Sequence, residues 1–487
     1  MPPIIPPTAS SKPIETTPLT VDALRRTDPI DYQTPSSPKD DGLRPAIQAS
    51  ASVALNYAGR VVLPLCAQAL CAGSSDGCEP TRLVSTATTG FFAGDLVAQL
   101  AAGPLVRALP GARLLAVSTT AWAAVALATP STLLTSPTLL VLQQALLGLC
   151  CGLGYPSAHK LLGEAKLEPR RRSTALSLVN SSAAWGSMAA SLLTPLIVRH
   201  SHWRLPFYCV ALCGLAASAT LASGRGGAVS RDRRNSGSTT GVTGVTGVTA
   251  GMGGASALGR ARAAAASAAQ GAANVSADLG AWAADPVVRA MLFSLYVSGI
   301  ALHGLQPFVP TLLVDRHGVE LDDLGRLTAV PPAAQVAACF SCGWIADRVT
   351  ARRWLSPQQT RVAFQAIATL GPAAALLLLS SPAFAVSPVA STALVTLWTG
   401  CSSFSSAGIF ALLHHVARAR AGELFVVGNI CSKLGALLAA QLLQPALHAI
   451  GWEVLLRAVA MHYLLAAALL LPRMDKKRVD AAAQLFP

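Results

Sequence analysis

The sequence predicts an all-α membrane protein in which twelve transmembrane helices form two six-helix bundles. Three observations predict this fold. The 487-residue chain has a mean hydropathy of +0.49 and only 12% charged residues, which excludes an ordinary soluble protein. Twelve apolar runs approach or exceed the length of about 17–25 residues that a membrane helix needs. A low-complexity break divides these runs six and six.

The predicted spans follow one another with short connections, except at the central break. They are 52–72, 83–105, 114–130, 138–162, 174–198, 205–222, 288–314, 327–346, 362–380, 387–411, 423–446 and 453–471. We therefore expect bundles over 51–222 and 287–472, a disordered N-terminal tail over 1–50, a linker over 223–286 and a C-terminal tail over 473–487.

The basic residues gather in loops on one side of the predicted bundle. Arg170–Arg172, Arg348–Arg353 and Lys476–Arg478 all contribute to this side if the twelve helices alternate in direction. Short loops rich in Arg and Lys lie in the cytoplasm, so we expect both termini there. The net charge of +14 then follows the topology and indicates no nucleic-acid partner. The sequence does not identify the membrane.

Arg60 lies midway along the first apolar run, Ser52–Ala72. A guanidinium in hydrocarbon costs about 2.5–3.5 kcal/mol on insertion scales. Such a charge is tolerated when it faces a watery cavity, a carboxylate or an anionic ligand. Asn56 lies one turn earlier on the same helix face. The pattern predicts an anion-attracting group near mid-depth.

The segment Gly343–Arg353, GWIADRVTARR, resembles the loop motif of the major facilitator superfamily, with Asp347 and Arg348 as its Asp-Arg pair. In that motif Gly343 allows close packing at a tight corner, and the pair takes part in gating. Other stretches resemble the anion:cation symporter branch, which includes vesicular glutamate, sialic acid and plastid phosphate transporters. They are TGFFAGDLVAQLAAGPLVRALPGARLL, ALLGLCCGLGYPSAHKLL, FVPTLLVDRHGVELDDLGRL and NYAGRVVLPL. The last stretch places Arg60 at the branch's substrate-site arginine.

Several positions depart from that branch. Gln144 and Cys151 stand where it often has an Arg and a Glu, which puts proton coupling through that carboxylate in doubt. His303 lies at mid-depth in the seventh span, and Gln306 is one turn away. We expect Gln144, His303 and Gln306 to offer polar contacts to a substrate, although His303 as a plain packing residue stays open.

Two membrane charges are new relative to the branch, Asp95 in span two and Lys433 in span eleven. At about 1.5 Å per helical residue, both lie at a depth similar to that of Arg60. We expect a salt bridge between the halves that opens as access alternates. Two alternatives stay open. The pair is a static contact that fixes helix register, or Asp95 pairs with Arg60 and leaves Lys433 as a free cation for the substrate.

Arg107 stands where the superfamily motif has an Asp that faces the start of span eleven. That span begins with Glu423, so we expect Arg107 to approach Glu423 in gating. A solvated arginine among lipid headgroups is the alternative. Cys71 and Cys78 flank the first outer loop, and whether they pair stays open.

The resemblance implies a secondary transporter that moves inorganic phosphate or an organic anion by alternating access. We expect a monomer in a lipid bilayer, with sodium or proton coupling as an option and without a cofactor, metal or enzymatic activity. A transporter-like sensor or scaffold is the first alternative. A facilitator for a neutral or cationic solute is the second, and it requires Asp95 to be unpaired and to face the cavity.

Overall fold

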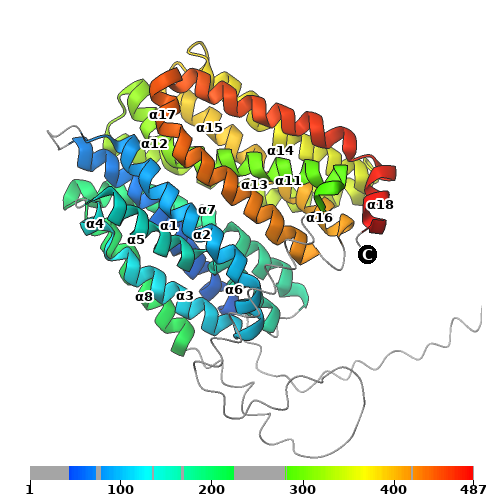
Figure 1. Ribbon diagram of the computed structural model, residues 1–487, viewed down its shortest axis with the longest axis horizontal. Helices are drawn as coiled ribbons and strands as arrows, with labels where there is room; N and C mark the ends of the chain where they lie inside the picture. The colour runs from blue at the N-terminus through cyan, green and yellow to red at the C-terminus, as the bar shows by residue number, and fades with distance from the viewer. Residues whose placement is uncertain are drawn as a thin grey trace, which may run out of the picture. The chain divides into compact units, whose positions relative to one another are not determined.

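The computed structural model describes residues 43–72, 78–133, 136–165, 169–223, 280, 282–417 and 421–485. Most of these residues are helical. Figure 1 shows two groups of helices, α1 to α8 in blue to green and α11 to α18 in green to red. Each group supplies one half of the predicted arrangement.

The first half contains six spans, two of which are interrupted. Its helices are α1 (Arg44–Ala72), α2 (Pro80–Ala108), α3 (Gly111–Ala126) with α4 (Thr129–Thr132), α5 (Pro137–Cys151) with α6 (Gly154–Glu164), α7 (Pro169–His200) and α8 (Leu205–Ser223). The bounds lie close to those expected from the apolar runs.

The second half repeats this plan with more interruptions. Its elements are α11 (Pro286–Ser298), η3 (Gly299–Leu305), η4 (Gln306–Phe308), α12 (Val309–His317), α13 (Leu321–Ala351), α14 (Pro357–Ser380), α15 (Pro388–Ser402), η5 (Ser403–Ser406), α16 (Ile409–Val416), α17 (Ala421–Leu470), η7 (Leu471–Arg473) and α18 (Lys476–Leu485). We call the end of the bundle that carries Cys71 and Cys78 the disulfide end. The opposite end, where α8 ends and α11 begins, is the linker end.

The described helices account for all twelve spans. Ten of them are long and apolar enough to cross a bilayer. One of the ten contains α17, which turns at Gly451 (φ 68°, ψ 174°) and so supplies two spans. Helix α2 is not among the ten, although it is 29 residues long. It carries Arg82, Asp95 and Arg107, and these charges lower its hydropathy.

The seventh span changes its helical form at mid-depth. Gly299–Leu305 is a π-helix and Gln306–Phe308 a 3₁₀ turn, between the α-helices α11 and α12. Pro307 and Pro310 lack the N–H that a regular helix would use here. π-Helical segments are rare and often mark functional sites. The change of form places His303 and Gln306 on irregular backbone.

Glycines bring membrane helices into backbone contact in both halves. A Cβ on Gly94 of α2 would lie 1.8 Å from the carbonyl oxygen of Ala145 in α5, and one on Gly148 would lie 1.9 Å from that of Phe91. In the second half, a Cβ on Gly299 would lie 1.9 Å from the carbonyl oxygen of Ser432 in α17. Small residues at these contacts allow the close approach on which membrane helix packing depends.

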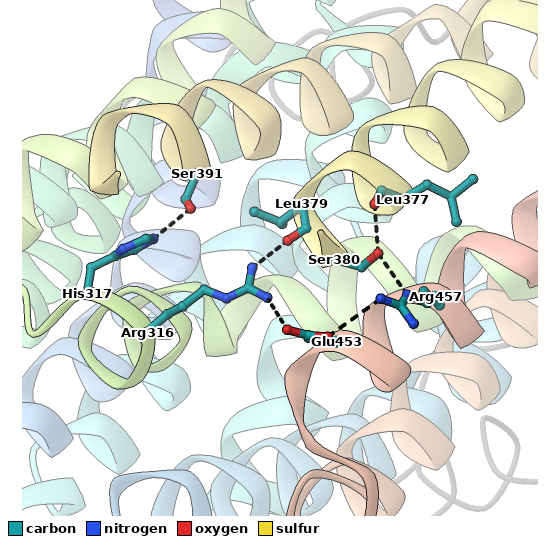
Figure 2. A network of polar contacts seen from close by, with 8 residues as sticks. All are labelled: Arg316, His317, Leu377, Leu379, Ser380, Ser391, Glu453 and Arg457. Atoms are coloured by element: carbon teal, nitrogen blue, oxygen red, sulfur yellow. Dashed lines mark hydrogen bonds and ion pairs between the residues drawn. The ribbon is translucent and has the colours of Figure 1, made fainter. Parts of the chain in front are cut away.

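A polar network holds the disulfide end of the seventh span against spans nine and twelve (Figure 2). Arg316 at the end of α12 donates to the carbonyl oxygen of Leu379 in α14, and its second nitrogen lies 4.0 Å from Glu453. Glu453 also pairs with Arg457 at 3.5 Å, and Arg457 donates to Ser380 at 3.3 Å. Helix α12 is thus bound to its own half.

The corner after the eighth span differs from the sequence-based expectation. Helix α13 continues through Asp347 and Arg348 to Ala351, and the chain turns at Arg353 (φ 55°). A Cβ on Gly343 would meet no described atom within 4 Å, so the predicted close packing at this glycine is wrong. The helix simply extends further than the apolar run, and the turn comes later.

The predicted segment boundaries also need correction. Helix α1 begins at Arg44, so the end of the tail assigned to 1–50 is helical. Trp282, within the assigned linker, is fully buried against Val287 and Leu413. Val479 of α18 belongs to the same cluster, so the C-terminal tail packs on the second half. Residues 1–42 of the N-terminal tail and residues 224–279 and 281 of the linker lie outside the described residues.

We predict that Gly94→Ala destabilises the protein, because the added methyl group overlaps the backbone of α5. Overpacking of this kind costs about 1–3 kcal/mol. The matched control is Gly163→Ala on α6, where an added Cβ meets no described atom within 4 Å. It should be neutral or slightly stabilising, since alanine favours helix over glycine. Thermal unfolding of the purified variants in detergent distinguishes the two, and equal midpoints would contradict the packing account.

Candidate functional site

A cavity of about 350 Å³ lies between the two halves. It is lined by residues of α1 to α8 and, in the second half, of η3, η4, α12, α13 and α15. Five predicted substrate contacts are among its lining residues, namely Arg60, Asn56, Gln144, His303 and Gln306. Among the described lining residues, Arg60 is the one Arg or Lys side chain, and none is Asp or Glu.

Two aromatic rings contact the guanidinium of Arg60. Its Cζ lies 4.2 Å from the ring centroid of Tyr57 and 4.2 Å from that of Phe91. Such cation–π contacts stabilise a cation in a partly desolvated site. Arg60 also lines the cavity, so its N–H donors on that side are available to a ligand. No ion pair between described residues involves Arg60, and its buried Nε has no hydrogen-bond partner among them.

Two further buried polar atoms on the cavity wall lack partners among the described residues. They are Oδ1 of Asn56 and Nε1 of Trp122. Trp122 packs against α1 at Gly59, where a Cβ would lie 2.7 Å from the indole ring. Buried polar groups are normally hydrogen-bonded, so unsatisfied atoms on a cavity wall point to a ligand or to water.

Asp95 and Lys433 form a buried ion pair between the halves. Oδ2 of Asp95 in α2 lies 3.0 Å from Nζ of Lys433 in α17. The two residues are 1% and 5% exposed. Neither belongs to the cavity lining. Of the two partners considered for Asp95, the structure places Lys433 against it, and so the predicted role of Lys433 as a cavity contact is not supported by its position.

Neutral side chains of α2 and α17 form hydrogen bonds next to this ion pair. Gln99 donates to Oδ1 of Asp95 at 3.3 Å and to the carbonyl oxygen of Gly152 at 3.2 Å. Asn429 donates to Oε1 of Gln99 at 3.3 Å. The network joins α2, the end of α5 and α17, so it supplies the additional hydrogen bonds that a buried ion pair needs.

His303 lies near the ion pair as well as on the cavity wall. The ring of Phe92 separates the two, with its centroid 5.4 Å from Nζ of Lys433 and 6.0 Å from the centroid of His303. The irregular backbone of η3 holds His303 in this position. Phe92 and η3 thus connect the surroundings of Lys433 with the cavity wall.

Polar contacts also join the halves at the disulfide end. Gln68 donates to Thr311 at 2.7 Å, and Ser85 donates to the carbonyl oxygen of Ala440. Arg199 and Asp322 pair at 2.7 Å. These contacts hold α1, α2 and α7 against α12, α17 and α13.

Glu79 makes two of the contacts at this end. Its carboxylate lies 3.1 Å from Nε2 of Gln444 and 2.7 Å from Nε2 of His448. A disulfide between Cys71 and Cys78 directly precedes it, which answers the open question about these cysteines. The disulfide ties the start of α2 to the end of α1 beside the contact with α17.

The remaining predicted gating residues are Arg107, Glu423, Asp347 and Arg348. The side chain of Arg107 lies outside the described residues, so its contact with Glu423 stays a prediction. Asp347 and Arg348 are exposed, and Arg348 lies over the ring of Trp344 with its Cζ 5.2 Å from the centroid. They lie far along α13 toward the linker end and do not line the cavity.

Sequence reasoning missed the aromatic part of the site. Phe91 and Trp122 carry no charge, and aromatic residues in apolar runs are usually core residues. One signal was present for Phe91, which precedes Asp95 by one turn and so shares its helix face. For Trp122 no comparable signal exists, because its contact with Gly59 comes from a different span.

Comparisons with known proteins identify one family. The family model described as the Major Facilitator Superfamily matches residues 51–440. A protein of Arabidopsis thaliana named "Probable anion transporter 3, chloroplastic" is 25% identical over 349 residues, which cover 72% of this chain but only 64% of the relative. Its namesake in Oryza sativa subsp. japonica is 23% identical, over 80% of this chain and 70% of the relative.

Solved structures show the same fold. The inward-open conformation of the xylose transporter XylE from E. coli superposes with a TM-score of 0.64 at 12% identity, over 91% of this chain and 99% of the other. A peptide transporter POT in complex with sulfate gives a TM-score of 0.62 at 15% identity, over 89% and 94%. At these identities the likeness concerns the fold alone.

We predict strong coupling between Asp95 and Lys433 in a double-mutant cycle. Asp95→Asn or Lys433→Met alone leaves one buried charge without its partner, which costs about 3–5 kcal/mol. The double variant should recover about 2–3 kcal/mol of the summed loss. Unfolding of the four proteins in detergent measures this recovery.

The control for this cycle is the exposed pair of Asp323 and Arg326, whose atoms are 3.6 Å apart. Asp323→Asn should change stability by at most about 1 kcal/mol, because solvent screens the pair. Additive losses at Asp95 and Lys433 would mean that the buried contact does not stabilise the fold.

Proposed function

Because the chain belongs to the Major Facilitator Superfamily, we propose that it is a secondary active transporter that moves a small anion across a membrane by alternating access. One observation carries this proposal. Arg60 is a cavity-wall cation that forms no ion pair with a carboxylate among the described residues, and the described lining contains no acidic side chain. The names of the two plant relatives, probable anion transporters, support the same substrate charge.

In this proposal the anion binds the N–H donors of Arg60 that face the cavity. A guanidinium presents a planar fork of donors that matches carboxylate and phosphate oxygens. Nε1 of Trp122 adds a donor, and Asn56 and Gln144 offer neutral amides. His303 and Gln306 face them from the other half, so both halves contact the substrate.

Alternating access would remake the contacts between the halves. The distribution of basic loops favours both termini in the cytoplasm, so the disulfide end would face away from it. The described contacts of Glu79, Gln68 and Arg199 close that end, which is consistent with an inward-facing state. Outward opening would break them and bring the linker end together.

The residues expected at the linker end complete the gating proposal. They are Arg107, Glu423, Asp347 and Arg348. The Asp95–Lys433 pair near the centre would be opened or shifted in each cycle. Asp95 is also the candidate for coupling to a proton or a sodium ion, since its protonation would release Lys433.

A facilitator for a neutral or cationic solute is the second candidate, and it has less support. It requires Asp95 to be unpaired and to face the cavity. Asp95 lies 3.0 Å from Lys433 and outside the lining. A sensor or scaffold that uses the same fold differs from the proposal in moving no solute, so transport assays separate the two.

We predict that Arg60→Ala strongly reduces uptake of anions into proteoliposomes and that Arg60→Lys retains more of it. Alanine removes the charge, whereas lysine keeps it but loses the planar fork. The panel contains inorganic phosphate, carboxylates and sulfonates, with proton and sodium gradients imposed separately. The rate should fall at least about tenfold for Arg60→Ala, which corresponds to about 1.4 kcal/mol.

The control is Arg326→Ala, which removes an exposed arginine at the disulfide end and should leave uptake unchanged. A wild-type protein that moves none of these anions under any gradient would favour the sensor or scaffold. Equal uptake by wild type and Arg60→Ala would remove Arg60 from the substrate site.

A further inference from the structure

The two halves of the protein line the cavity with different kinds of side chain. Arg60, the described cation of the lining, belongs to the first half. The wall supplied by the second half contains mostly apolar side chains and neutral amides, together with His303 and Thr328. Its apolar members include Leu302, Pro310, Pro331, Pro332 and Val395, and its amides are Gln306 and Gln335. Among the described lining residues of this half there is no Arg or Lys.

The charge of the site matches a single negative charge. Lys433 is neutralised by Asp95 at 3.0 Å and is absent from the lining, so Arg60 offers one positive charge to a ligand. A phosphate group carries about −1.5 to −2 at pH 7. Its second charge would be desolvated in the cavity without a partner, which is unfavourable. A carboxylate or sulfonate leaves no such excess.

The size of the cavity indicates a ligand with an uncharged body. Pockets that hold small organic molecules have volumes of about 300–1,000 Å³, and this cavity has about 350 Å³. A tetrahedral oxyanion on Arg60 would leave the prolines and Val395 of the opposite wall in contact with water. An organic body would cover that wall and gain the free energy of apolar burial.

We infer that the substrate is a monovalent organic anion whose charged group binds Arg60 on the first half and whose uncharged body lies against the second half. This inference rests on the proposed function. A molecule that reaches both walls would contact the second half only in states that bring the halves together, and so it would favour those states.

Four probes test charge and body separately by thermal stabilisation of the full-length protein in detergent. Benzenesulfonate and phenylphosphonate share a body, but at about pH 8 the phosphonate carries close to two charges. Methanesulfonate keeps the single charge without the ring, and inorganic phosphate is the fourth probe. At this pH a histidine in water is neutral, so His303 adds no charge. We expect benzenesulfonate to bind at least about tenfold more tightly than the other three probes.

Two variants of one residue sharpen the charge test. Gln335→Lys places a second cation on the opposite wall, and phenylphosphonate should then bind more tightly than benzenesulfonate. Gln335→Met has a similar length without the charge, and it should keep the wild-type order. Arg60→Ala should lose the stabilisation by benzenesulfonate.

The possible results distinguish a failure of the inferred substrate class from a failure of the proposed function. Tighter binding of inorganic phosphate or phenylphosphonate than of benzenesulfonate by the wild-type protein, lost in Arg60→Ala, would overturn the monovalent organic class and leave anion transport standing. Equal binding of methanesulfonate and benzenesulfonate would overturn the role of the body. Stabilisation by none of the probes, or stabilisation that persists in Arg60→Ala, would contradict the proposed function itself.

Discussion

The ion pair between Asp95 and Lys433 decides which cation the cavity presents. Arg60, Asp95 and Lys433 lie at similar depth, and they comprise two positive charges and one negative charge. A buried carboxylate needs a partner at hydrogen-bond distance. Since Lys433 fills that place at 3.0 Å, Arg60 is left to the aromatic rings and the cavity. The anion site therefore depends on a contact that lies outside the cavity.

The same contact links the cavity to the interface between the halves. Lys433 follows Ser432, whose carbonyl oxygen approaches Gly299 at the start of the π-helical segment. That segment carries His303 into the cavity wall, and Phe92 lies between His303 and Lys433. The Arg316 network holds α12 to its own half (Figure 2). Because Glu453 is itself a residue of α17, both η3 and α12 contact this helix.

Much of the fold follows from hydropathy and charge, and less of the site does. The twelve spans and the similar depth of Arg60, Asp95 and Lys433 were predictable, because length, charge and depth along a helix are linear properties of the sequence. The pair of Asp95 with Lys433 was expected, but depth alone left Arg60 open as the partner. The cover of Arg60 by Phe91, the place of Trp122 against Gly59 and the closure of the disulfide end by Glu79 were not. They depend on the rotation and packing of helices from different spans, which periodicity does not specify. The buried position of Trp282 was missed because its surroundings are low in complexity.

Lys433 holds the carboxylate of Asp95 and so leaves Arg60 available to the anion. Measuring how tightly two variants bind an anion tests this most directly. In Lys433→Met the carboxylate of Asp95 loses its partner and should compete with the anion for Arg60, which weakens binding of an anion such as benzenesulfonate. In the double variant Asp95→Asn/Lys433→Met this competitor is gone, and the account predicts that affinity returns close to the wild-type value. A double variant that binds as weakly as Lys433→Met would contradict the account, because it would mean that Lys433 itself holds the anion.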